Sequence, residues 1–170
     1  SSDLFTKNPD FGTLIGDGPD TSLYFVNIDR DSPGYGNRVA MRWSVTTGRG
    51  KFICPRYMAV RPAWSTPLEP DTTYAVFVTN NLRGGEGEIP TPQADFAAVI
   101  GDSAPSEARL ERAWRAYEPL RDYLVDKEIG ADTLLAAAVF TTMDPTAEVP
   151  AIRAGIRAQP APTLQDVTVC

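Results

Sequence analysis

Several short segments of the chain are rich in apolar and β-branched residues, and successive side chains of a strand lie on opposite faces. In 38–46 apolar positions alternate with polar ones, whereas 22–29 and 73–79 carry apolar residues on both faces, which implies that both faces are covered; 57–61 (YMAVR) is a further short strand. The stretch 134–142 (LLAAAVFTT) ends in β-branched and aromatic residues, which favour a strand, although its alanines leave a helix as the alternative. The pattern therefore predicts a set of antiparallel strands.

Two shorter segments give weaker signals. Lys51–Ile53 is interpreted as a short edge strand, because Pro55 cannot donate a hydrogen bond to a neighbouring strand. Residues 95–100 (DFAAVI) fit either a short strand or a helical turn. Trp43 lies on the apolar face of the clean amphipathic strand 38–46, so we expect it in the core between sheets.

The segment 103–125 has a helical repeat instead. Apolar residues recur there at steps of three and four, which forms one stripe along a helix: Leu110, Trp114, Tyr117, Leu120 and Leu124. Pro119 removes one backbone hydrogen bond and is expected either to kink the helix or to split it near 117–118. Because an apolar stripe must be buried against something, this helix is a candidate docking element or lid.

The turn before strand 73–79 carries a recognisable motif. Leu68, Pro70, Thr72 and Tyr74 spell Leu-x-Pro-x-Thr-x-Tyr. The motif resembles the E–F corner of fibronectin type III and related immunoglobulin-like domains, in which a tyrosine hydroxyl bonds backbone a few residues upstream. The alternative is a generic turn and strand. The resemblance implies a mainly β fold: an immunoglobulin-like antiparallel β-sandwich, with a helical insertion before the last strand and a short C-terminal helix.

A second resemblance lies at 140–142 (FTT), where bacterial immunoglobulin-like modules often end their last strand. The region 22–142 is similar to the N-terminal immunoglobulin-like region of large secreted bacterial proteins, some of which carry a virulence-factor-type lipase (α/β-hydrolase) domain downstream. The expected organisation is a turn-rich segment 1–21, the sandwich 22–142, and a short helix with a Pro-rich linker at 143–170. The implied partner is a downstream domain of the same parent chain, or another surface protein.

Composition narrows the function further. A net charge of −6 argues against a nucleic-acid partner, and no run of about 18 apolar residues could span a membrane. The chain has no histidine, which excludes Ser-His-Asp and Cys-His catalysis within it. The nucleophile motif Gly-x-Ser-x-Gly is also absent, so no catalytic residue carries over from the lipases. Cys54 and Cys170 either pair with each other or elsewhere.

Candidate ligand sites are few. Asn27, Asp29 and Asp31 have the spacing that opens a calcium loop, but the rest of such a loop is missing and a plain polar turn is the alternative. No other cofactor is expected. Carbohydrate contact would need exposed aromatic residues, for which Tyr35, Tyr57 and Trp64 are candidates. Trp64, which lies between two prolines, is instead expected to pack under the corner.

Catalysis by other groups has little support in the sequence. The acidic pairs Asp29/Asp31 and Glu86/Glu88 lie in loops, where carboxylates are usually solvated. The three lysines, at positions 7, 51 and 127, lie in turns or near element ends, where burial cannot depress the pKa. The sequence therefore predicts a non-catalytic accessory module, located in the periplasm, at the cell surface or outside the cell.

Overall fold

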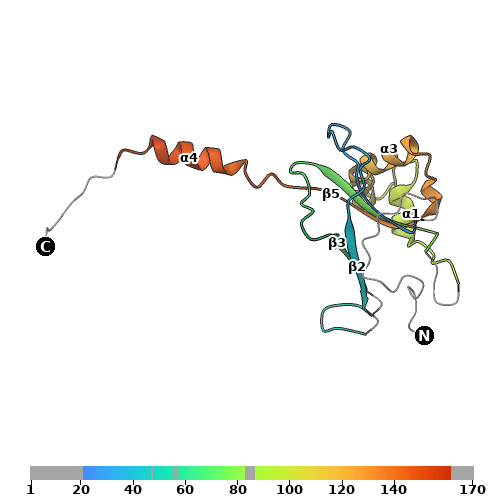
Figure 1. Ribbon diagram of the computed structural model, residues 1–170. Helices are drawn as coiled ribbons and strands as arrows, with labels where there is room; N and C mark the ends of the chain where they lie inside the picture. Colours follow the sequence, from blue (N-terminus) through green and yellow to red (C-terminus); the bar gives the residue numbers. More distant parts are fainter. Residues whose placement is uncertain (1–20, 47, 56, 83–86, 162–170) are drawn as a thin grey trace.

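The structure, a computed structural model, describes residues 21–46, 48–55, 57–82 and 87–161 (Figure 1). These residues form two antiparallel sheets and four α-helices. Helices hold more of them than strands do, so the described part is mixed α/β and not mainly β. The predicted turn-rich segment 1–21 lies outside the described residues except for Thr21. Of the predicted linker, the part after Ala161 lies outside them.

A three-stranded sheet forms the middle layer, in the order β1 (Leu23–Asn27), β4 (Thr73–Thr79), β5 (Leu134–Thr141). The central strand β4 is buried on both faces, in keeping with the apolar residues that its sequence places on both. Ala75 and Phe77 face the helices, whereas Tyr74 and Val78 face the second sheet. Residues 134–141 form the strand β5, so the strand prediction is confirmed and the helical alternative for its alanines is wrong.

Two helices, α1 (Ala94–Ile100) and α3 (Glu118–Asp126), bury side chains against one face of this sheet, and α2 (Ala108–Ala116) packs against both of them without a buried residue of its own. A 3₁₀ turn, η1 (Ala131–Thr133), then leads into β5. The break between α2 and α3 lies at Tyr117, as Pro119 predicts, because proline is tolerated only in the first turn of a helix. The helices and the sheet share the helix-side core, which comprises Val26, Ile28, Ala75, Phe77, Ile100, Leu120, Tyr123, Leu124 and Leu134.

The second sheet, a hairpin of β2 (Met41–Thr46) and β3 (Tyr57–Pro62), packs against the opposite face. The inter-sheet core between them comprises Leu23, Phe25, Met41, Tyr74 and Val78. Trp43, expected within this core, is only partly buried and packs against its edge. The predicted edge strand at Lys51–Ile53 is wrong, because these residues form a turn in which the Gly50 N–H donates to the Ile53 carbonyl (3.1 Å).

An arm leaves this body at the end of the edge strand β5. It carries α4 (Glu148–Ala158), the predicted short C-terminal helix, and continues in the direction of β5 away from the other elements (Figure 1). Every residue of α4 is exposed. No helix within the described ranges has the length and apolar character needed to cross a membrane.

Candidate functional site

The corner motif forms as the sequence predicts. The ring of Tyr74 is 3% exposed, and its hydroxyl accepts a hydrogen bond from the Glu69 N–H (3.0 Å). The Thr72 hydroxyl donates to the Pro70 carbonyl (2.8 Å), while Leu68 packs beside the inter-sheet core. Because the tyrosine oxygen is the acceptor here, the corner satisfies a backbone donor. These residues hold the fold together and offer no binding surface.

The calcium candidates form a polar turn. An Asn27 side-chain oxygen accepts from the Asp29 N–H (2.9 Å), and Asp29 accepts from the Asp31 N–H (3.0 Å) and the Thr73 N–H (3.1 Å). Asn27 is itself buried and donates to the Ser32 hydroxyl (2.8 Å). Local capping of this kind explains the alternate Asn and Asp residues without a metal. Among the described residues, no group of three His, Cys, Asp or Glu side chains could hold a metal ion.

The predicted docking helix is used inside the body. Leu120 and Leu124 are fully buried in the helix-side core, and Leu110 and Trp114 are partly buried. The Tyr117 hydroxyl donates to the Ala137 carbonyl of β5 (2.7 Å), and burial raises the pKa of Tyr117, so the donor stays protonated. Leu120 and Leu124 therefore pack on the protein's own sheet and are not available to a partner, whereas a docking role for Leu110 and Trp114 of α2 stays a prediction.

The three candidate aromatic residues lie on different elements. Trp64 is 68% exposed, so the expected packing under the corner is wrong; the residue that follows it, Ser65, has a left-handed backbone (φ 64°). The Arg61 guanidinium lies 4.3 Å from the centre of its ring. Tyr57 is half-exposed at the other end of β3, whereas Tyr35 packs edge-on against Tyr123 of α3. These positions give no shared sugar-binding platform.

The candidate catalytic groups are solvated or engaged elsewhere. Lys127 lies 3.0 Å from Asp126, and their hydrogen bond raises the pKa of Lys127, so the amine keeps its proton and cannot act as a base. Lys51 and Glu88 are exposed, and Lys7 and Glu86 lie outside the described residues. Cys54 is exposed and unbonded, while its possible partner Cys170 also lies outside them.

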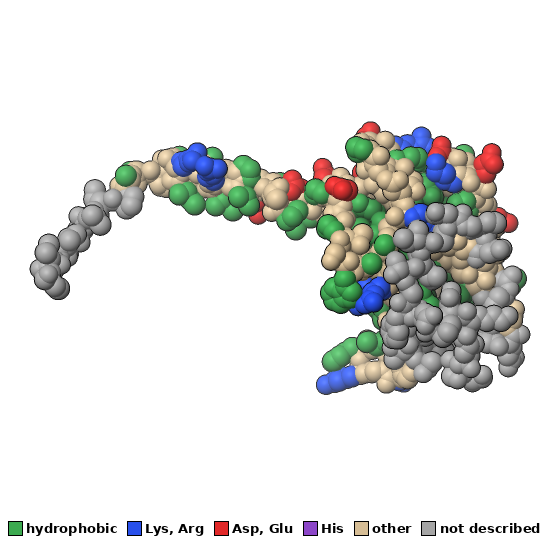
Figure 2. Space-filling model, viewed as in Figure 1, with side chains coloured by type: hydrophobic (Ala, Val, Ile, Leu, Met, Phe, Trp, Pro, Cys, Tyr) green, Lys and Arg blue, Asp and Glu red, His purple; other side chains and the backbone are tan. Residues whose placement is uncertain are grey.

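Helix α4 carries a stripe of exposed apolar side chains, and no residue of the described structure covers it. Val149, Ile152 and Ile156 are 59%, 58% and 69% exposed and follow one another at steps of three and four. Figure 2 shows these apolar atoms along one side of the arm. Arg153 and Arg157 flank the stripe, and no carboxylate in the described ranges forms an ion pair with either.

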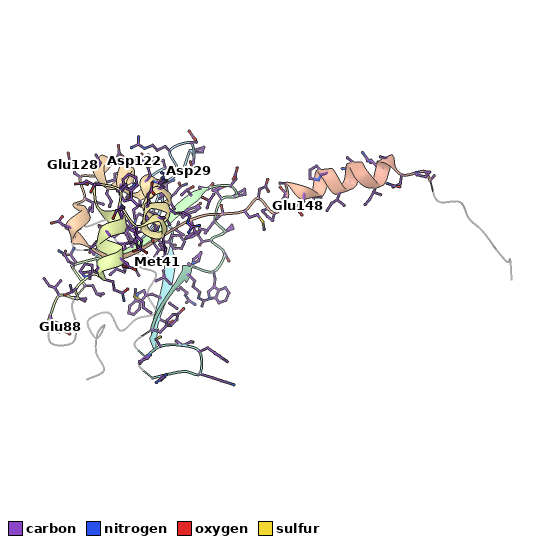
Figure 3. All side chains as sticks on the ribbon, turned by 180° about the vertical axis from the view of Figure 1, so that it is seen from behind. Asp29, Met41, Glu88, Asp122, Glu128 and Glu148 are labelled. Carbon is purple, nitrogen blue, oxygen red and sulfur yellow. The ribbon has the colours of Figure 1, made fainter. Side chains whose placement is uncertain are left out.

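The apolar repeat of this stripe is present in the sequence, but Pro150 lies within it and suggests an interrupted helix. Proline reads as a helix breaker in an apolar repeat, whereas here it lies in the first turn of α4, where no hydrogen bond is lost. The turn before the helix is fastened by Asp144, whose carboxylate accepts from the Thr146 N–H (2.8 Å) and hydroxyl (2.7 Å). These two bonds lower the pKa of Asp144. Glu148, labelled in Figure 3, marks the start of α4 outside the body.

The exposed apolar stripe of α4 is thus the candidate site that the described residues present. Comparison with known proteins adds no assignment, because no family model, curated protein or solved structure matches the chain.

Proposed function

We propose that the chain is a non-catalytic immunoglobulin-like accessory module of a larger exported bacterial protein, and that it packs against a neighbouring domain through α4. The observation that carries this proposal is the exposed stripe of Val149, Ile152 and Ile156 on an arm outside the body. An isolated helix of this length is marginal in water, so it needs a surface to pack on.

The size of the stripe favours a tethered partner. Covering three aliphatic side chains that are about three-fifths exposed is worth about 4 kcal/mol. That gain is too small to offset the translational and rotational entropy lost by two free proteins. A domain in the same chain avoids most of that cost, because tethering makes docking intramolecular. Arg153 and Arg157 favour a partner surface with carboxylates beside an apolar groove.

The immunoglobulin-like part of the proposal rests on the corner and the sheets. Tyr74 lies near the start of β4, and its hydroxyl bonds the backbone of Glu69, five residues before it, as the tyrosine of such a corner does. Two antiparallel sheets face one another across the inter-sheet core, and the helices precede the last strand β5. The expected location is the periplasm, the cell surface or the exterior.

The alternative is that the chain is the N-terminal part of a secreted lipase or esterase. The parent reading frame separates the two, because a hydrolase needs a Gly-x-Ser-x-Gly motif and a histidine beyond residue 170. In either case we expect the 170-residue chain to be inert toward nitrophenyl esters, casein and nitrophenyl glycosides. Turnover that one substitution within this chain abolishes would contradict the module proposal.

Amide hydrogen exchange of α4 tests the docking directly. We expect the amides of Glu148–Ala158 to exchange more slowly in the longer protein than in the 170-residue chain. Ile152→Glu removes the difference, because it places a charge in the apolar contact. Ala154→Glu is the matched control on the opposite face of the same helix and leaves the protection in place. Equal exchange in the long and short proteins would rule out docking through α4.

A further inference from the structure

Positive charge is concentrated in one part of this acidic chain. Six of its sixteen Lys and Arg residues lie between Ser32 and Leu68, a stretch with no Asp or Glu, although the whole chain has a net charge of −6. That stretch contains the β2–β3 hairpin. The protein therefore presents a basic projection on an acidic body, which orients it toward an anionic surface.

The tip of the hairpin combines this charge with exposed apolar side chains. All residues from Gly48 to Pro55 are exposed, and the turn closed by the Gly50–Ile53 hydrogen bond places Lys51 and Phe52 at its apex. Phe52 is 88% exposed and Ile53 44%. The Lys51 ammonium lies 5.2 Å from the centre of the Phe52 ring. Figure 2 shows apolar and basic atoms together at the end of this projection.

The hairpin holds its tip away from the body. Six consecutive residue pairs, from Met41 opposite Pro62 to Thr46 opposite Tyr57, join its strands. At the other end Met41 is fully buried where β2 meets the body (Figure 3). Strands of this length carry the tip about 20 Å from that anchor. Phe52 and Ile53 can therefore reach a flat surface before the acidic body does.

The paired strands of the hairpin add further positive charge, which also favours an anionic partner. Arg42 and Arg61 lie directly opposite each other across the strands, an arrangement of like charges that destabilises a sheet. No ion pair in the described ranges involves either arginine. The Arg61 guanidinium lies over the Trp64 ring, and anionic groups bound beside the hairpin would offset the positive charge that both arginines retain.

We propose that the β2–β3 hairpin docks on an anionic lipid bilayer, with Phe52 and Ile53 inserted at the level of the headgroups. Arg49 and Lys51 then contact lipid phosphates while their aliphatic stems follow the apolar side chains inward. A nucleic acid or other polyanion would also attract the charges, but it gives an aliphatic apex such as Ile53 nothing to bury against. The inference is independent of the proposed function and of α4.

Vesicle sedimentation tests the proposal with the full 170-residue chain. The probes are vesicles of phosphatidylcholine alone and of phosphatidylcholine with about one-third phosphatidylglycerol. We expect binding to the anionic vesicles only. Lys51→Gln and Arg49→Gln each lower the partition coefficient about five-fold, which corresponds to about 1 kcal/mol per basic side chain near such a surface. Phe52→Ser lowers it about tenfold, because a large apolar contact is lost.

Two controls keep the outcome specific. Val125→Ser changes a residue of α3 that is 80% exposed, and Ile152→Ser weakens the stripe of α4, and neither alters the partition coefficient. All five variants change exposed side chains and keep the thermal midpoint of the wild type. Absence of binding to the anionic vesicles overturns the proposal. The proposal also fails if Lys51→Gln weakens vesicle binding but Phe52→Ser does not. It fails as well if Ile152→Ser abolishes vesicle binding.

Discussion

Replacing Tyr74 by phenylalanine isolates the hydrogen bond of the corner. The substitution removes the oxygen that accepts from the Glu69 N–H at 3.0 Å, and keeps the ring between Phe25 and Phe140, whose ring centres lie 6.0 and 6.1 Å away. A neutral hydrogen bond of this kind contributes about 1 kcal/mol to the free energy of unfolding. The bond is part-buried, so the expected loss is about 1 kcal/mol and rises toward about 3 kcal/mol if the Glu69 amide stays dry in the variant.

Urea unfolding measures this loss. With a slope of about 2 kcal/mol per molar, the midpoint of Tyr74→Phe falls by about 0.5 M while the slope stays unchanged. Tyr57→Phe is the matched control, because its side chain is half-exposed and no hydrogen bond involves it in the described structure. If Tyr74→Phe and Tyr57→Phe have the same midpoint as the wild type, the corner bond does not stabilise the fold and the reasoning from the motif fails.

Two further predictions concern α3 and the arm. Leu120→Ala removes a fully buried side chain from the helix-side core and lowers the free energy of unfolding by about 2–5 kcal/mol. Val125→Ala, on the same helix but 80% exposed, changes it by less than about 0.5 kcal/mol, and equal effects in urea unfolding would show that the helix does not pack as described. Asp144 titrates below its ordinary pKa of 3.8, so its two hydrogen bonds to Thr146 in the turn before α4 are intact above that pH and are lost as the pH falls through the lowered value. Thr146→Val moves the pKa of Asp144 upward in carboxyl NMR, and an unshifted wild-type pKa contradicts these bonds.

The predictions that succeeded depend on contacts close in sequence. Tyr74 reaches Glu69 only five residues away, and Pro119 breaks the helix at its own position. Such features follow from backbone chemistry that the sequence displays directly. The polar turn at Asn27 is also local, but its residue pattern fits a capped turn and the start of a calcium loop equally well, so only the hydrogen bonds decide.

The predictions that failed depend on long-range packing or on rare backbone angles. The stripe of α2 and α3 is evident in the sequence, yet its use inside the body depends on contacts such as Tyr117 with Ala137, twenty residues away. Trp64 is exposed in a turn where Ser65 has a left-handed angle, which serine seldom adopts and no sequence pattern signals. The stripe of α4 was missed because the position of Pro150 within the helix is known only once the helix start is known.

The way in which the arm leaves the body has a mechanical consequence. Thr142, the first residue after β5, is fastened to the corner, since its N–H donates to the Thr72 carbonyl (3.0 Å) and its hydroxyl to the Glu69 carbonyl (2.6 Å). The arm continues along the strand direction (Figure 1), so tension applied through α4 pulls β5 lengthwise past β4. The hydrogen bonds between antiparallel strands lie perpendicular to such a pull, so they bear the force together and do not break one after another.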